Sequence, residues 1–139
     1  MSDRDFFPDI VNPPSLADPR GFNHGVLAPV GTRLLAVAGQ IGWDGAGRLV
    51  GEDFPSQFAQ ALENVMEVVS AAGGEPAHVL ELTIFVTDKD AYLADLRAVG
   101  ERYRAIMGRS FPAMALVEVS ALVEPGALVE IRALAAVPP

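Results

Sequence analysis

Two segments of the chain have the apolar spacing of an amphipathic helix, and every other regular segment reads as a strand. The first helix is predicted over residues 54–72, with Asp53 as its N-cap and Gly73 as its stop. Its apolar stripe consists of Phe58, Leu62, Val65 and Val69. The second helix is predicted from a cap at Asp88 or Asp90 to about Met107. Its stripe consists of Leu96, Val99, Tyr103 and Met107.

Two helices can cover only one face of a sheet, so the pattern predicts an α+β fold in which a mixed sheet carries both helices on one face. The length of 139 residues fits a single domain spanning residues 1–139. The opposite face of the sheet then lacks a cover within the chain. A second copy of the chain is the most economical cover for it.

Five strands are predicted around these helices, and residues 1–20 are expected to form an extended N-terminal arm. The strands are predicted at residues 25–29, 33–41, 79–86, 110–119 and 128–134. A turn-rich segment at residues 124–126 lies between the last two strands. These two are therefore expected to form an antiparallel hairpin.

One face of that hairpin is expected to mix charged with large apolar side chains. Alternation places on it Met114, Leu116 and Glu118 from one strand and Leu128, Glu130, Arg132 and Leu134 from the other. Such a face suits neither open solvent nor a dry core. It is predicted to line a cleft or a subunit interface.

The composition excludes several kinds of site. With no cysteine, the chain has neither disulfides nor thiolate catalysis, and its two histidines, His24 and His78, have no metal-ligand spacing. No metal or cofactor is therefore expected. The net charge of −8, with ten scattered basic residues, disfavours nucleic acid as a partner. No membrane-spanning run and no signal peptide are seen, so the chain is expected to be cytoplasmic.

A set of short motifs from Asn12 to Ala135 resembles one known family in order and spacing. The motifs are Asn12-Pro13, the run from Gly21 to Val26, Ala38-Gly39-Gln40-Ile41, Gln57 with the run from Ala61 to Val65, Ala72-Gly73, Phe85-Val86-Thr87-Asp88, Phe111-Pro112-Ala113, Val117-Glu118-Val119 and Val129-Glu130-Ile131. By these the chain resembles the RidA/YjgF family of enamine and imine deaminases, also labelled L-PSP endoribonucleases. The resemblance implies a chorismate-mutase-like fold, a homotrimer and a small-molecule cleft between neighbouring subunits.

Five positions of the implied cleft depart from the family pattern. Met114 stands where the deaminases have an arginine that grips the substrate carboxylate, and a thioether carries no charge. Leu116 stands where active members are often polar, as does Ala115. Phe22 replaces a tyrosine and Ala38 replaces a common serine. The cleft is therefore predicted to be more apolar than that of the deaminases.

Other cleft positions match the family. Glu130 matches the glutamate that is thought to activate the hydrolytic water, which makes it the candidate catalytic residue. Gly39 and Gln40 match a strand end that approaches the ligand, and His24 lies beside the cleft. Arg132 shares a strand face with Glu130 and is a candidate for the missing cation.

Each of these residues also has a structural interpretation. Glu130 can be held in an ion pair with Arg132 or Arg109, and His24 can be a hydrogen-bonded turn residue. Three functions follow from the alternatives. The first is a deaminase-type hydrolase for a small, relatively apolar metabolite. The second is a catalytically silent trimeric binding or regulatory protein, and the third is an endoribonuclease.

Overall fold

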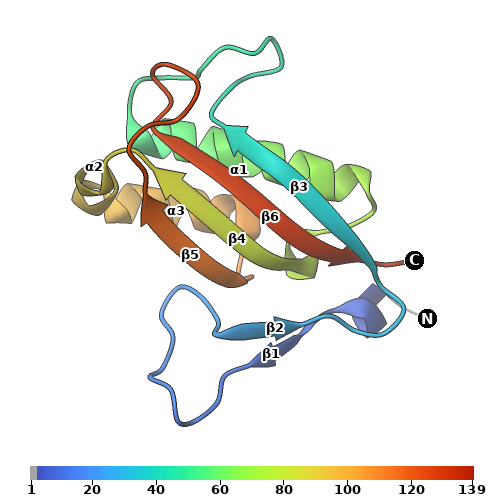
Figure 1. Cartoon of the computed structure of the whole chain (residues 1–139). Helices are drawn as coiled ribbons and strands as arrows, with labels where there is room; N and C mark the ends of the chain where they lie inside the picture. Colours follow the sequence, from blue (N-terminus) through green and yellow to red (C-terminus); the bar gives the residue numbers. More distant parts are fainter. Residues whose placement is uncertain (1–2) are drawn as a thin grey trace.

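The computed structural model describes residues 3–139 and shows a four-stranded mixed sheet with helices on one face only (Figure 1). The strand order is β3 (Arg33–Ile41), β6 (Val129–Val137), β4 (Val79–Val86) and β5 (Ala113–Glu118). β6 pairs antiparallel with both β3 and β4, and β5 pairs parallel with β4. The α+β architecture predicted from the helix and strand pattern is confirmed.

The predicted hairpin of the last two strands is wrong, because β4 lies between β5 and β6. β4 is nearly continuously apolar, which suits a central position in the sheet. The ten residues between β5 and β6 are enough to pass across the end of β4, where Val119 N–H donates to the Val86 carbonyl at 2.8 Å. At the same end, Thr87 N–H donates to the Leu128 carbonyl at 3.2 Å.

This topology also separates the side chains that the hairpin would have brought to one face. Met114 and Leu116 pair with Leu82 and Ile84 and pack against the core under the helices. The partners of Glu130 and Arg132 in β4 are Phe85 and Thr83, which alternate with that buried pair and so belong to the other face. The predicted mixed face therefore does not exist within one chain.

Helix α1 (Phe54–Ala71) begins and ends where the sequence indicates. The Asp53 side chain accepts a hydrogen bond from Ser56 N–H at 3.0 Å, and the bonds from Ser56 lower the pKa of this carboxyl. Gly73, with φ of +88°, follows the helix in a conformation that other residues avoid. The predicted stripe of Phe58, Leu62, Val65 and Val69 is buried.

The second predicted helix is in fact two helices, α2 (Lys89–Ala94) and α3 (Leu96–Met107). They are separated by Asp95, whose φ of −135° and ψ of 37° lie outside the helical region. Asp88, one of the two predicted caps, accepts from Asp90 N–H at 2.9 Å. Val99, Tyr103 and Met107 are buried as predicted, whereas Leu96 is 49% exposed.

The N-terminal segment is more regular than the extended arm that was predicted. It contains a short 3₁₀ turn (Asp3–Phe6) and strand β1 (Asp9–Val11), which pairs antiparallel with β2 (Gly25–Leu27). These two strands form a separate ribbon beside the main sheet (Figure 1). Residues 1 and 2 of the predicted arm lie outside the described residues.

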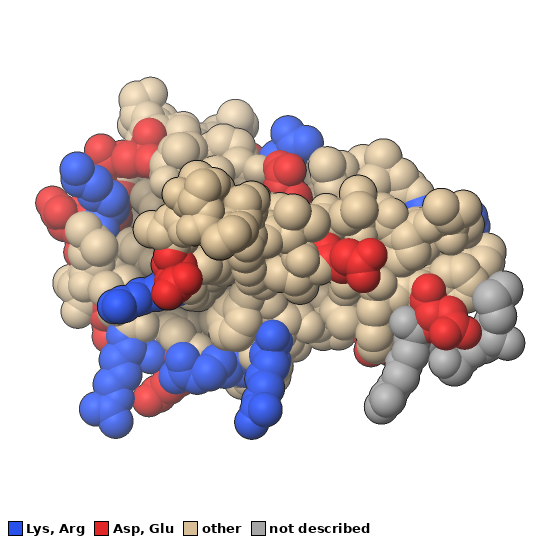
Figure 2. Space-filling view, turned by 90° about the horizontal axis from the view of Figure 1, so that it is seen from below, with Lys and Arg blue, Asp and Glu red and all other residues tan. Residues whose placement is uncertain are grey.

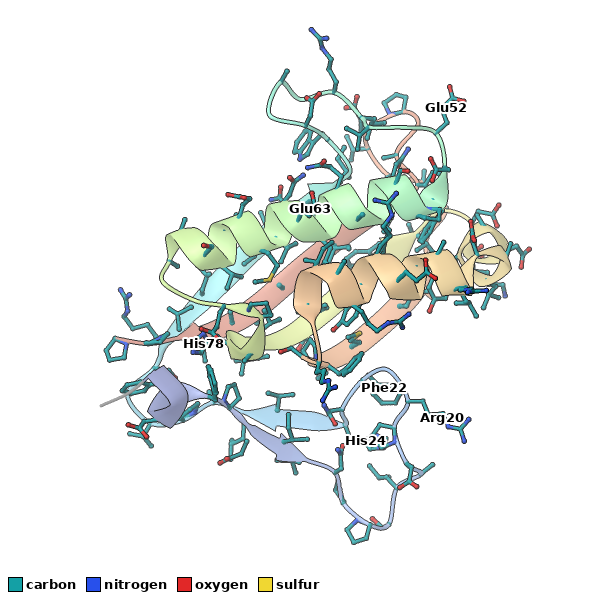
Figure 3. All side chains as sticks on the ribbon, turned by 180° about the vertical axis from the view of Figure 1, so that it is seen from behind. Arg20, Phe22, His24, Glu52, Glu63 and His78 are labelled. Carbon is teal, nitrogen blue, oxygen red and sulfur yellow. The ribbon has the colours of Figure 1, made fainter. Side chains whose placement is uncertain are left out.

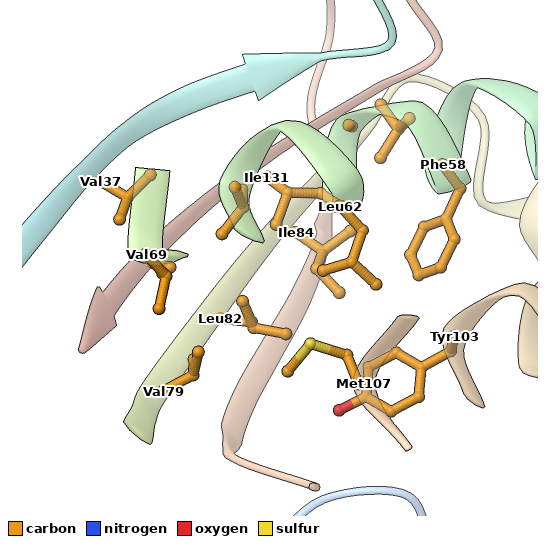
Figure 4. Packing of buried hydrophobic residues seen from close by; sticks show 14 of the residues in the cluster. Val37, Phe58, Leu62, Val69, Val79, Leu82, Ile84, Tyr103, Met107 and Ile131 are labelled. Atoms are coloured by element: carbon orange, nitrogen blue, oxygen red, sulfur yellow. The ribbon is translucent and has the colours of Figure 1, made fainter. Parts of the chain in front are cut away.

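The hydrophobic core lies between the main sheet and helices α1 and α3 (Figure 4). Its fully buried members include Leu62 and Val65 from α1, Leu82 from β4 and Ile131 from β6. The opposite sheet face carries no helix in Figure 1, and on that side Leu34 is 71% and Val117 44% exposed. In the described chain, no helix combines the length and apolar character needed to cross a bilayer.

Candidate functional site

An apolar cavity lies between α3 and the edge strand β5. Its volume is about 280 Å³, and it is lined by Gly21, Phe58, Ile84, Tyr92, Leu96, Val99, Gly100, Tyr103, Arg104, Phe111, Met114 and Leu116. We call this space the α3 cavity. Two predicted site residues, Met114 and Leu116, contribute to its wall, and Phe22 follows the lining residue Gly21 in sequence. Met114 therefore lies in a largely apolar wall.

Arg104 is the single charged residue in the wall of the α3 cavity. The position of its guanidinium depends on Gly100, one helical turn earlier. A Cβ atom added at Gly100 would lie 3.1 Å from Arg104 Nη1. The arginine side chain therefore folds back along α3 over the bare glycine. Among the side chains that the structure describes, none forms an ion pair with Arg104.

Two tyrosines give the α3 cavity its remaining polar atoms. The hydroxyl of Tyr103 donates to the Ser110 carbonyl at 2.5 Å, and burial raises the pKa of this phenol well above its usual value. Tyr103 is therefore a neutral donor that is already engaged. The Tyr92 ring packs edge-on against Phe54, and its hydroxyl has no hydrogen-bond partner in the described part of the chain. The Tyr92 hydroxyl is thus available to a ligand.

Glu130 lies in a second, smaller hollow of about 140 Å³, whose lining comprises Gly39, Ile41, Trp43, Val123, Glu124 and Glu130. We call it the Glu130 hollow. Glu130 is partly buried, and a Cβ atom added at Gly39 would lie 2.8 Å from its Cδ and Oε2 atoms. Gly39 therefore allows β3 to pass directly against this carboxylate. The two predicted residues Gly39 and Glu130 are brought together, and Met114 lies in a different hollow.

The Glu130 carboxylate is not tied up in the ion pair that the sequence left open. Among the described residues, the single ion pair joins Arg97 and Glu101 on the surface of α3, at 3.4 Å. Arg132 is exposed opposite Thr83 and lines neither hollow. Glu118 accepts a hydrogen bond from Lys89 N–H at 3.0 Å. Glu130 is therefore a carboxylate without a described intramolecular partner.

The predicted site residue His24 makes several contacts within the chain. His24 Nε2 donates to the Ala17 carbonyl at 2.7 Å, its backbone N–H donates to Asn12 Oδ1, and its ring meets Phe22 edge-on. His24 is thus hydrogen-bonded within its own loop. Figure 3 shows Phe22 and His24 together on the loop before β2, well separated from His78. The described residues contain no His, Asp and Glu cluster suited to a metal ion.

Gln40 and Ala38 occupy the β3 bulge beside Gly39. The Gln40 amide donates to the Ala38 carbonyl at 3.2 Å and accepts from Trp43 Nε1 at 3.4 Å. Gln40 thereby holds Trp43, which lines the Glu130 hollow. Its contribution to the site is to shape the wall of this hollow.

Sequence reasoning missed Arg104, Tyr92 and Trp43. The sequence does contain a signal for Arg104, which is Gly100 in the middle of the helix. A glycine there lowers helix stability by about 1 kcal/mol relative to alanine, so its presence needs a reason. The spacing of Gly100 and Arg104 is that of neighbours on one helix face. For Tyr92 and Trp43 no such local signal existed, since both reach their hollows through tertiary packing.

Replacing Gly100 with alanine tests how the Arg104 side chain lies over the bare backbone at Gly100. Because Gly100 has a helical backbone, the alanine should raise the free energy of unfolding by about 0.4–1 kcal/mol, a melting-temperature increase of roughly 3 °C. Thermal unfolding followed by circular dichroism measures this. A lower melting temperature would show that the Arg104 guanidinium cannot yield to the new methyl group.

These features define an α+β protein with helices on one sheet face, an apolar cavity at one sheet edge and an unpaired carboxylate against a bulged strand. The family model described as endoribonuclease L-PSP matches residues 16–137. The chain belongs to this family, which is the RidA/YjgF family that its motifs resemble.

Relatives with curated names and a solved structure agree with this assignment. The chain is 34% identical over 91 residues to the human 2-iminobutanoate/2-iminopropanoate deaminase, covering 65% of this chain and 64% of that protein. It is 35% identical over 89 residues to the Salmonella typhimurium protein of the same name, covering 64% and 69%. The match thus spans just under two thirds of the human relative. The structure of the Rid-family protein YyfB from Yersinia pestis, of unknown function, has a TM-score of 0.82 at 34% identity, covering 94% of this chain and 98% of that one.

Proposed function

We propose that this chain is a hydrolase with imine or enamine deaminase chemistry, acting on a small and relatively apolar metabolite. The observation that carries the proposal is Glu130, a partly buried carboxylate that is free of described partners and pressed against Gly39. Such a carboxylate can act as a general base toward water. The names of the curated relatives support the same chemistry.

The proposed reaction uses only water and proton transfers. Glu130 takes a proton from water as the water oxygen bonds to the imine carbon, whose nitrogen is protonated. Glu130 then returns its proton to the carbinolamine nitrogen, the carbon–nitrogen bond breaks to release ammonia, and the hydroxyl proton passes to solvent as the carbonyl forms. The products are a carbonyl compound and ammonia. An enamine enters the same sequence after it takes a proton on carbon to become the imine.

We further propose that the site is completed between two copies of the chain, in a closed homotrimer. Met114 faces the helices at the edge strand β5, whereas Glu130 belongs to the opposite side of the sheet. One copy therefore cannot present both to one substrate. A second copy seated on the open sheet face would cover the exposed Leu34 and Val117 and could bring its own Glu130 to the α3 cavity of its neighbour.

The assay for this function is the release of ammonia and keto acid from imino acids that an amino-acid oxidase generates in the same solution. The unmodified chain should accelerate hydrolysis of imines with branched or aromatic side chains more than that of 2-iminopropanoate. Met114→Arg should shift this preference toward the small substrate, because the longer charged side chain takes up apolar space that the larger imines would fill. No acceleration of any imine by the unmodified chain contradicts the proposal.

A complementation experiment tests the shared site. Met114→Trp should block the α3 cavity and Glu130→Gln should remove the base, so each variant alone is expected to be inactive. Co-assembled from a denatured mixture, they should regain a fraction of the activity, because some interfaces combine an intact cavity with an intact glutamate. Failure to regain activity, with size-exclusion chromatography showing mixed oligomers, would place both residues in one chain's site and contradict the proposal.

A silent binding protein is the second candidate, and Met114 in place of a cationic residue favours it. The endoribonuclease function is disfavoured by the net charge of −8. The basic residues are, however, not evenly scattered, because Arg97, Arg102 and Arg104 lie in α3 and Arg109 lies just after it. Figure 2 shows Lys and Arg side chains gathered along one edge of the molecule. RNA binding with a steep salt dependence would favour the endoribonuclease function.

A further inference from the structure

We infer that Arg104 is the anchor for a carboxylate group in the α3 cavity, and that the ligand of this cavity is a small carboxylate with an aromatic or branched apolar body. The inference rests on the proposed function in one respect, since it assigns how the same substrate is held. It replaces the hypothesis that Arg132 supplies the positive charge that Met114 lacks.

The first argument is the charge of the cavity wall. The side chains around it are aliphatic or aromatic apart from Arg104, and aromatic rings come from Phe58, Tyr92, Tyr103 and Phe111. An apolar body fills such a wall well, and four rings favour a flat group. One cation in an otherwise uncharged wall selects for one anionic group on the ligand.

The second argument is that the guanidinium is free and held near the cavity. None of the described carboxylates pairs with Arg104, although Arg97 on the same helix pairs with Glu101. The bare backbone at Gly100 lets the guanidinium lie back along α3, with Nη1 3.1 Å from the place a Cβ atom would take. A planar fork in this position can donate two parallel hydrogen bonds to a carboxylate.

The third argument is the free hydroxyl of Tyr92, which lines the same cavity from α2. A carboxylate has two oxygens and about four acceptor positions, so a guanidinium that donates two hydrogen bonds leaves about two positions for further donors. Arg132 on β6 offers none of this, because it lines neither hollow. The wall of the α3 cavity thus combines apolar surface, one cation and one hydroxyl.

The test uses two probes of the same shape, phenylacetate and phenylacetamide, titrated into the full chain by calorimetry or by NMR. Phenylacetate should bind at least about 10-fold more tightly than the amide, because hydrogen bonds to a charged partner are stronger. Arg104→Gln should remove this preference by weakening phenylacetate binding about 10-fold or more, with little effect on the amide. Arg104→Lys should restore part of it.

Arg102→Gln and Arg132→Gln are the matched controls, because each removes one positive charge without touching the wall of the α3 cavity. Both should leave phenylacetate binding within about 2-fold of the unmodified chain. Equal losses of phenylacetate affinity in Arg102→Gln and Arg104→Gln would show that the effect comes from net charge, and would overturn the inference. A loss of phenylacetate affinity in Arg132→Gln alone would overturn the inference and identify Arg132 on β6 as the anchor.

The same variants in the imine hydrolysis assay separate this inference from the proposed function. Phenylacetate binding that depends on Arg104, without hydrolysis of any imine, would support Arg104 as the carboxylate anchor and contradict the proposed deaminase function. Hydrolysis that Arg104→Gln leaves unchanged, together with unchanged phenylacetate binding, would support the deaminase and overturn the role of Arg104. Gly100→Ala should weaken phenylacetate binding several-fold although the helix itself is expected to become more stable, a combination that simple unfolding cannot produce.

Discussion

Replacing Glu130 with glutamine is expected to lower the rate of imine hydrolysis by about 10²–10⁴-fold, which corresponds to about 3–5 kcal/mol of transition-state stabilisation. The amide keeps the size and the fit against Gly39 but cannot take a proton from water. The loss should therefore appear in kcat more than in KM. Steady-state ammonia release over a range of imine concentrations measures both constants.

Glu81→Gln provides the matched control for this prediction. Glu81 is exposed on β4 opposite Leu134, where it accepts a hydrogen bond from Thr83 Oγ1 at 3.2 Å. It lines neither the α3 cavity nor the Glu130 hollow, so activity should stay within about 2-fold. Equal losses in both variants would indicate a general effect of charge on assembly. Full activity in Glu130→Gln would mean that another group is the base.

Replacing Gln57 with glutamate is expected to destabilise the fold by about 3–5 kcal/mol at neutral pH. Gln57 is 1% exposed, and its amide nitrogen donates to the carbonyls of Gly51 and Gly126 at 3.3 and 3.1 Å. Its amide oxygen accepts from Leu128 N–H at 2.8 Å. A glutamate would turn one carboxylate oxygen toward two carbonyl oxygens in a site closed to water, which combines charge burial with lost hydrogen bonds.

The destabilisation should depend on pH in a defined direction. Burial among carbonyl oxygens would raise the pKa of the new carboxyl in the folded state above its value of about 4.3 in the unfolded chain. The folded state then binds more protons, so stability falls as pH rises from about 4.3 until the folded-state pKa is passed. Urea unfolding at pH 4.5 and 7.5 checks this, since the difference from the unmodified chain should be larger at pH 7.5.

Gln60→Glu is the control on the same helix. Gln60 is half-buried, and its amide donates to Asn64 Oδ1 at 2.9 Å, so the new carboxylate would remain in contact with water. A cost of at most about 1 kcal/mol is expected, with little pH dependence. If Gln57→Glu were no more costly than Gln60→Glu, water would have to reach Gln57. The hydrogen bonds of Gln57 to the backbone of Gly126 and Leu128 also position the start of β6, the strand that carries Glu130. Loss of these bonds in Gln57→Glu should therefore lower activity as well.

The sequence determined the features that depend on neighbours along the chain. The apolar stripe from Phe58 to Val69, the Asp53 cap and the glycine stop placed α1 correctly, because helix periodicity and end chemistry are local. The short motifs indicated the family to which the chain belongs. The break at Asp95 and the pairing of Asp9–Val11 with β2 were missed, since neither has a strong local signal.

Only the tertiary structure decided which strands are neighbours and therefore which side chains share a face. The alternation in residues 113–118 and 129–137 was read correctly, but alternation states only that every second residue shares a face. Insertion of β4 between the two strands turned Met114 toward the helices and left Glu130 on the other side. The Arg104 guanidinium lies over Gly100 at a cavity whose other walls come from distant segments, and a cavity is a property of packing that no local pattern encodes.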